Sequence, residues 1–235
     1  MSNIITNKIV YKLAVSTANN IYQQQERLRK INWTCGEANL DKEFSQLACE
    51  CCVQSWNILT QNTPYQNIKI NCVIPDINIT FILPDNSTVF KKIELKSSTK
   101  SKIPGSTIKN LDINQPLIYC LRPINKNDIY QIKCSQYHHA MGINNTEMFQ
   151  DRTPRPRINF DKMEPLDNFP QYQKKKKKAW VKHYANCALN RINKPENCNH
   201  SWQDDMIKEI KNKTIKEFIK NTSLTQFQNM KNLYD

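Results

Sequence analysis

The sequence predicts an α+β fold, in which helices flank a central sheet. Three observations support this class: apolar residues with helical periodicity up to residue 58, an alternating pattern from residue 68 onward, and helical patterns again after residue 179. The strands are therefore gathered in the middle of the chain instead of alternating with helices, as they do in α/β proteins. At 235 residues, the chain is long enough to bury a substantial core.

Two helices are predicted in the first quarter of the chain. Between residues 4 and 31, apolar side chains recur about every four residues, which is typical of one buried helical face. A second helix is predicted over residues 39–58, where Asp41 and Glu43 in the first turn suit the positive end of the helix dipole. Glu43 and Glu50 lie seven residues apart and therefore share one flank of this helix.

The middle of the chain carries short runs of apolar, β-branched and aromatic residues that predict strands. They span residues 68–72, 77–83, 89–95, 117–121 and 129–134. Residues 84–87, Pro-Asp-Asn-Ser, suit a reverse turn, so the second and third runs are expected to form a hairpin. After Gln136 the chain becomes irregular, and helices are predicted to begin near Ala179 and at Ser201.

The composition restricts the function classes. The formal net charge is +13, from 34 Lys and Arg against 21 Asp and Glu, so a polyanion is the expected partner, with nucleic acid ahead of an anionic membrane surface. The three glycines exclude the phosphate-binding loops of ATPases and NAD enzymes. No run of eighteen apolar residues and no secretory signal is present, so we expect a soluble, intracellular protein of the cytoplasm or nucleus, without a membrane partner.

The cysteines do not form the pattern of a disulfide framework. There are nine of them, an odd number, and Cys49, Cys51 and Cys52 are crowded into one predicted helix. We expect most of them to be reduced and to pack as small apolar side chains.

Three charged residues converge at the open end of the predicted hairpin. If the chain turns around residues 85 and 86, Asp76 lies across from about residues 94 to 95 on the neighbouring strand. Glu94 and Lys96 are two residues apart and share a face of that strand. Two carboxylates can bind a hard divalent cation, and a lysine beside them can orient a water that the cation has acidified.

Asp85 also follows a proline and precedes Glu94 by nine residues, but it is a poor candidate ligand. Seven or eight extended residues separate the two carboxylates by about 25 Å, at roughly 3.3 Å each. Two ligands of one cation cannot lie so far apart. We therefore expect Asp85 to accept a hydrogen bond within the turn.

Asp76 with Glu94-Leu95-Lys96 resembles the motif of the PD-(D/E)XK nuclease superfamily, and the chain looks most like its type II restriction endonuclease branch. The resemblance implies a restriction-endonuclease-like fold, with a central mixed sheet flanked by helices. It also implies that Asp76, Glu94 and the Leu95 carbonyl bind Mg²⁺, with Mn²⁺ as a substitute, and that Lys96 orients the attacking water. Glu43 or Glu50 matches the place of an accessory acid.

The length fits one large domain or a domain with an appended lobe, and we expect a single nuclease domain over residues 1–235. The resemblance covers a catalytic core at about 40–135, and a basic helical part follows at about 150–235. The expected activity is sequence-specific cleavage of double-stranded DNA. A homodimer is favoured because palindromic sites are bound by two-fold symmetric proteins. Two other functions fit the same residues: a structure-specific or repair nuclease of this fold, and a basic nucleic-acid-binding protein without catalysis. An E-x-K sequence is also common on solvated sheet faces.

Several basic and hydroxyl side chains are candidates for DNA contacts. The loop after Lys96 is rich in hydrogen-bond donors, and two further basic stretches follow, although a lysine run is often only a solvated segment or a nuclear import signal. The candidates are Ser98, Lys100, Lys102, Lys109, Arg155, Arg157, Lys174, Lys175 and Lys176.

Three further patterns are weaker. Gln115 and Tyr119 have the Q-x-x-x-Y spacing of RecB-like nucleases, but that motif lies on a helix and these residues are in a predicted strand, so a structural role for Tyr119 is favoured. The adjacent His138 and His139 are expected to be surface polar residues. Four residues are suitable zinc ligands but match no common zinc motif, so we expect no structural zinc. They are His183, Cys187, Cys198 and His200.

Overall fold

The computed structural model describes residues 5–33, 42–106, 112–141, 156–168 and 171–176, with short pieces at 182–183, 186–187, 208–209 and 211–213. The chain divides into two compact units, Met1–Val181 and Lys182–Asp235. The first unit contains a mixed five-stranded sheet flanked by helices, which confirms the predicted α+β class. The short described pieces of the second unit are helical. Most residues of the two helices predicted to begin near Ala179 and at Ser201 lie outside the described part of the chain.

The N-terminal helical region contains two helices rather than one. Helix α1 spans Asn7–Gln23, and α2 spans Gln25–Lys30. They are separate because Gln24 leaves the helical conformation, with φ −89° and ψ 35°. The Thr6 hydroxyl caps α1 by accepting a hydrogen bond from the Ile9 N–H.

The second predicted helix is α3, which spans Lys42–Thr60 and packs against α1. Its apolar residues Phe44, Leu47 and Trp56 face the core, as the periodicity predicts. None of the helices in the described part of the chain is both long and apolar enough to cross a membrane.

The sheet has the strand order β1-β2-β3-β5-β6. All neighbours are antiparallel except β3 and β5, which are parallel, so the sheet is mixed. The strands span Lys69–Val73 (β1), Ile77–Ile82 (β2), Thr88–Ser98 (β3), Pro116–Leu121 (β5) and Gln131–Gln136 (β6). A separate antiparallel pair joins β4, Lys102–Pro104, to β7, Arg157–Asn159.

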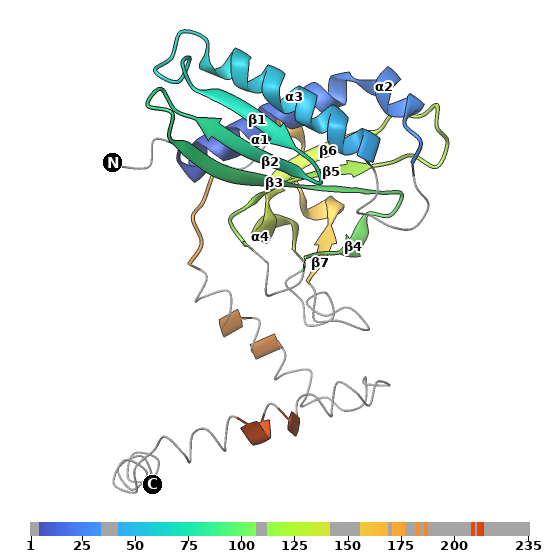
Figure 1. Ribbon diagram of the computed structural model, residues 1–235. Coiled ribbons are helices and arrows are strands. Elements are labelled where there is room, and N and C mark those ends of the chain that lie inside the picture. The colour runs from blue at the N-terminus through green and yellow to red at the C-terminus, as the bar shows by residue number, and fades with distance from the viewer. Residues whose placement is uncertain are drawn as a thin grey trace, which may run out of the picture. The chain divides into compact units, whose positions relative to one another are not determined.

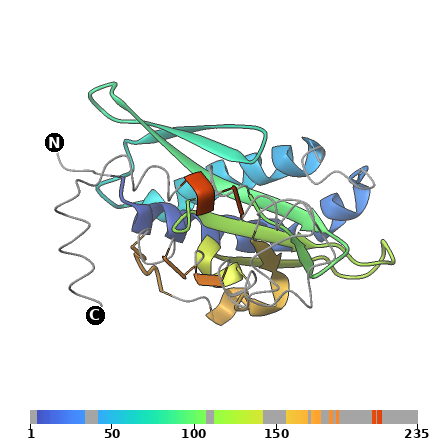
Figure 2. The same cartoon turned by 90° about the horizontal axis from the view of Figure 1, so that it is seen from below.

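The five-stranded sheet has a complete layer on one face and a partial layer on the other. Helices α1 and α3 lie on the first face (Figure 1). Their apolar side chains share one buried cluster with Ile79 and Phe81 of β2 and Leu95 of β3. The opposite face carries a smaller apolar cluster that includes Leu117 and Tyr119 of β5. This second layer is built from β4, β7 and the short helix α4, Tyr137–Ala140 (Figure 2).

The predicted hairpin is present and has the predicted turn. Strands β2 and β3 pair with Ile77 opposite Ile93 and Ile82 opposite Thr88. Asn86 in the turn has a φ of 63°, a left-handed conformation that asparagine tolerates well. Because the pairing starts at Ile77 and Ile93, the residues just beyond it, Asp76 and Glu94, are brought next to each other.

Candidate functional site

Asp76 lies in the short connection between β1 and β2, immediately before the first paired residue of β2. Its φ is 58°, so it occupies the left-handed region that few residues other than glycine, asparagine and aspartate adopt. One carboxylate oxygen, Oδ1, accepts a hydrogen bond from the Leu95 N–H at 2.9 Å. The main chain of β3 therefore fixes this carboxylate in place.

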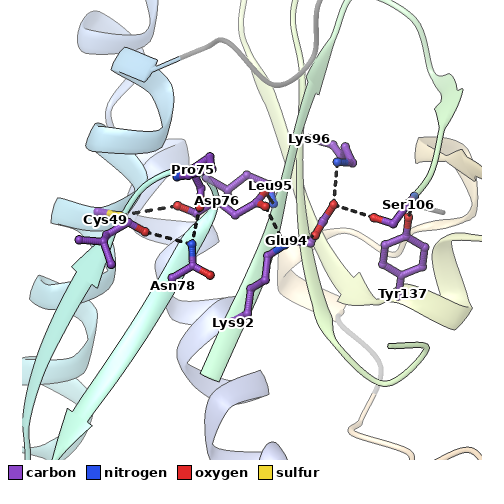
Figure 3. Close-up of polar contacts among 11 residues, drawn as sticks. Cys49, Pro75, Asp76, Asn78, Lys92, Glu94, Leu95, Lys96, Ser106 and Tyr137 are labelled. Carbon is purple, nitrogen blue, oxygen red and sulfur yellow. Dashed lines mark hydrogen bonds and ion pairs between the residues drawn. The ribbon is translucent and has the colours of Figure 1, made fainter. Parts of the chain in front are cut away.

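Glu94 is almost fully buried on the face of β3 that carries the partial second layer. Its Oε1 lies 2.7 Å from the Lys96 Nζ and accepts a hydrogen bond of 2.9 Å from the Ser106 hydroxyl (Figure 3). The Ser106 N–H in turn donates to the Tyr137 hydroxyl. Glu94 is thus oriented from its own strand and, through Ser106 and Tyr137, from the second layer.

Lys92 joins the two carboxylates. Its Nζ lies 2.8 Å from Oδ2 of Asp76 and 3.0 Å from Oε2 of Glu94 (Figure 3). No sequence motif assigns Lys92 to the site, although the two-residue spacing places it on the same strand face as Glu94 and Lys96. Two carboxylates of neighbouring strands therefore face one cationic nitrogen.

The charges of this cluster compensate one another. Burial alone would raise the pKa of Glu94, but the ammonium groups of Lys96 and Lys92 hold it below its ordinary value. Burial would lower the pKa of Lys92, but Asp76 and Glu94 raise it above its usual range. Glu94 is therefore an anion at neutral pH, the form in which a carboxylate binds a metal ion.

The cluster is partly open to solvent. Lys92 is the most solvent-exposed side chain of the cluster, whereas Glu94 and Lys96 are buried, as their exposed fractions show. They are 41% for Lys92, 21% for Asp76, 9% for Lys96 and 6% for Glu94. The opening lies where the second layer ends, because the preceding residues of β3 on this face, such as Phe90, are exposed. A ligand can therefore reach the carboxylates from the uncovered half of the sheet.

The donor set suits a hard divalent cation. Leu95 directs its N–H toward Asp76, and in an extended strand the carbonyl of the same residue points toward the same edge. Asp76, Glu94 and this carbonyl would be the protein ligands of the ion. In the part of the chain that the structure describes, no three His, Cys, Asp or Glu side chains gather to hold a metal. Mg²⁺ often uses only one or two carboxylates and takes its other ligands from water and substrate phosphate.

Comparisons of the chain with protein-family models, with curated proteins and with solved structures found no match.

The predicted accessory acids on α3 have partners outside the cluster. Glu50 lies 2.7 Å from the Arg27 guanidinium of α2, and Glu43 accepts a hydrogen bond from the Asn32 N–H at 3.0 Å. Helix α3 contacts the cluster instead through the Cys49 thiol, which lies 3.8 Å from the Asp76 carbonyl oxygen. Glu43 and Glu50 stabilise the contact of α3 with the preceding segment.

Several predicted DNA contacts lie on or beside the segment between the end of β3 and Ser106. Lys100 and Lys102 are exposed after β3, and Ser98 orders this turn by accepting a hydrogen bond from the Lys100 N–H. Arg157 on β7 pairs with Pro104 of β4, two residues before Ser106. The predicted contacts Lys109 and Arg155 lie outside the described residues.

The beginning of the lysine run is ordered. The main chain of Lys175 makes two hydrogen bonds with the Asn114 side chain, at 2.8 and 3.0 Å, and the Gln173 N–H donates to the Gln136 side chain. Lys174, Lys175 and Lys176 are exposed. They are therefore held near the start of β5 with their side chains accessible to solvent.

Asp85 has the turn role that was expected. Its carboxylate accepts hydrogen bonds from the Ser87 N–H at 3.0 Å and the Ser87 hydroxyl at 2.6 Å, and these bonds lower the pKa of the exposed Asp85. Tyr119 is fully buried in β5, and its hydroxyl donates to the Lys100 carbonyl oxygen. The structural interpretation of Tyr119 is confirmed.

The remaining candidates are the histidine pair and the four residues considered as zinc ligands. His138 and His139 are half-buried, not surface residues, and burial lowers the pKa of His138 to about 4. His138 is therefore neutral at pH 7. In the second unit, the Cys187 thiol lies 3.7 Å from the Nε2 of His183. Cys198 and His200 lie outside the described residues, so the expected absence of zinc stays a prediction.

Proposed function

We propose that the chain is a Mg²⁺-dependent endonuclease of the restriction-endonuclease-like type, acting on double-stranded DNA. The observation that carries this proposal is the convergence of Asp76 and Glu94 on one cationic nitrogen, with Lys96 bound to Glu94. The antiparallel hairpin followed by the parallel β3–β5 pair supports the restriction-endonuclease-like fold. The net charge of +13 and the exposed lysines suit a DNA backbone.

Asp76, Glu94, Lys96 and the Leu95 carbonyl each have a part in the proposed reaction. Asp76, Glu94 and the Leu95 carbonyl would hold Mg²⁺, which when bound acidifies a water and stabilises charge on the phosphate. The Lys96 ammonium orients the attacking water oxygen toward phosphorus. The new P–O bond forms as the bond to the 3′ oxygen breaks. The attacking water releases a proton to solvent and the departing 3′ oxygen takes one up, so the products are a 5′-phosphate and a 3′-hydroxyl. The Ser106 hydroxyl holds the Glu94 carboxylate in the orientation in which it contacts Lys96.

A second function is favoured by the balance of charge in the cluster. Two ammonium groups neutralise two carboxylates, as they also do in ion-pair networks that only stabilise a fold. A basic nucleic-acid-binding protein without catalysis therefore has to be separated from a nuclease by experiment.

A digest of long, unmodified duplex DNA separates these functions. We expect the full chain to cut such DNA with Mg²⁺ or Mn²⁺ and to leave it intact in excess EDTA. With Ca²⁺ we expect the chain to bind DNA without cutting it efficiently. Discrete fragments support sequence-specific cleavage, whereas trimmed ends or a continuous smear support a structure-specific or repair nuclease.

Two outcomes would contradict the nuclease proposal. DNA that is bound in a gel-shift assay but stays uncut with every divalent ion selects the non-catalytic function. Full activity in excess EDTA would contradict the metal requirement.

A further inference from the structure

Lys92 occupies the point on which the two carboxylates of the proposed metal site converge. Its ammonium lies 2.8 Å from Asp76 Oδ2 and 3.0 Å from Glu94 Oε2, which are normal charge-assisted hydrogen-bond distances. Of the four charged side chains, Lys92 is also the most exposed. It therefore covers the carboxylates on the side from which an ion or a phosphate would approach.

Lys92 and a divalent cation compete for the same oxygens. Mg²⁺ binds oxygen ligands at about 2.1 Å, and Ca²⁺ at about 2.3 to 2.6 Å. An ammonium within 3 Å of the same two carboxylates would repel such an ion strongly in this half-buried place. The lysine side chain must leave the carboxylates before they can act as metal ligands.

The Lys92 side chain can move away from the carboxylates toward solvent, where a DNA phosphate can bind its ammonium group. Because it is long, flexible and partly exposed, it can turn toward the uncovered half of the sheet without disturbing the core. A DNA phosphate that approaches from this side offers oxygens of the same charge as the two carboxylates. The lysine can then exchange a carboxylate pair for a phosphate.

We propose that Lys92 is an internal counter-ion that weakens divalent-cation binding until a DNA phosphate draws its ammonium away. This inference rests on the proposed function and adds a coupling to it: the metal site becomes fully available only with substrate in place. Lys92 is accordingly a positioning residue, which controls whether the carboxylates of Asp76 and Glu94 are available to bind a divalent cation.

The test is a calorimetric titration of Ca²⁺ into the full chain, with and without a short DNA duplex. We expect Lys92→Met to bind Ca²⁺ at least about tenfold more tightly than wild type in the absence of DNA, because one repelling charge is removed. We also expect the duplex to raise the Ca²⁺ affinity of wild type by a larger factor than that of Lys92→Met.

A neighbouring lysine provides a matched control. Lys91 lies on the same strand with its Nζ 2.9 Å from Asn7 Oδ1, on the opposite face from Lys92. Lys91→Met removes the same charge from the chain and should leave Ca²⁺ affinity unchanged. Lys92→Gln, which keeps hydrogen-bond donors, is the second variant should Lys92→Met fail to fold.

The outcomes separate this inference from the proposed function. If wild type cleaves DNA and the Lys92 variants bind Ca²⁺ as weakly as wild type, the counter-ion role is wrong and the nuclease proposal stands. An equal gain in Ca²⁺ affinity in Lys91→Met and Lys92→Met would also overturn the counter-ion role, since the change in net charge alone would explain it. If wild type neither cleaves DNA nor binds a divalent ion, and the Lys92 variants bind none either, both proposals fail.

Discussion

Asp76→Asn is expected to lower the single-turnover rate of DNA cleavage by several orders of magnitude, whereas Asp85→Asn should leave it nearly unchanged. Asp76 contributes one of the two negative charges that face the proposed cation, and its substitution removes an anionic ligand. Asparagine tolerates the left-handed conformation at residue 76, so the variant changes charge without forcing the backbone to move. The rates are measured with saturating Mg²⁺ and excess enzyme.

Asp85→Asn is the matched control, because it removes the same charge from the other end of the hairpin. Asp85 is exposed and accepts hydrogen bonds from Ser87, which an asparagine side chain can also accept. An inactive Asp85→Asn together with an active Asp76→Asn would show that the assignment of the ligand is wrong.

Glu94→Gln is expected to abolish cleavage and, in addition, to lower the free energy of unfolding. Glu94 is almost fully buried and is paired with both Lys96 and Lys92. Removing one partner of a buried ion pair leaves an uncompensated charge, which typically costs about 3–5 kcal/mol. Urea unfolding of wild type and variant measures this cost.

The same variant has a predictable pH dependence. The pKa of Glu94 is lower in the folded chain than its ordinary value of 4.5, so its ionisation stabilises the fold above that pH and the contribution is lost as the pH falls below it. We expect the difference in unfolding free energy between wild type and Glu94→Gln to shrink on acidification below pH 4.5. An unchanged difference across this range would contradict the buried ion pair.

The hairpin and its two acids could be predicted from the sequence because local rules determine them. Alternation assigns each residue of β3 to a face, and the turn around Asn86 sets the register that brings Asp76 to Glu94. The same rules place Lys92 on the correct face. They do not say whether a long, flexible side chain turns toward solvent or bridges two carboxylates, which is why its role was missed.

Contacts between segments that are far apart in the sequence could not be predicted from local sequence patterns. The Ser106 hydroxyl reaches Glu94 only because β4 pairs with β7, which lies more than fifty residues later in the chain. The positions of Glu43 and Glu50 depend on how α3 packs against α2, and helical periodicity gives no information about that contact. The division of the first predicted helix at Gln24 likewise leaves its apolar pattern intact.

The central claim is that Asp76 and Glu94 hold one divalent cation, and iron-directed cleavage of the protein tests it most directly. Fe²⁺ replaces Mg²⁺ in the full chain with a short DNA duplex present, because the duplex is expected to draw Lys92 away from the two carboxylates. Ascorbate with hydrogen peroxide then produces hydroxyl radicals at the bound ion, which cut the nearby backbone. Mass spectrometry should locate the cuts in the segments around residues 76 and 94, and both excess Mg²⁺ and Asp76→Asn should suppress them. Cuts confined to other segments, or cuts at these segments that persist in Asp76→Asn, would contradict the claim.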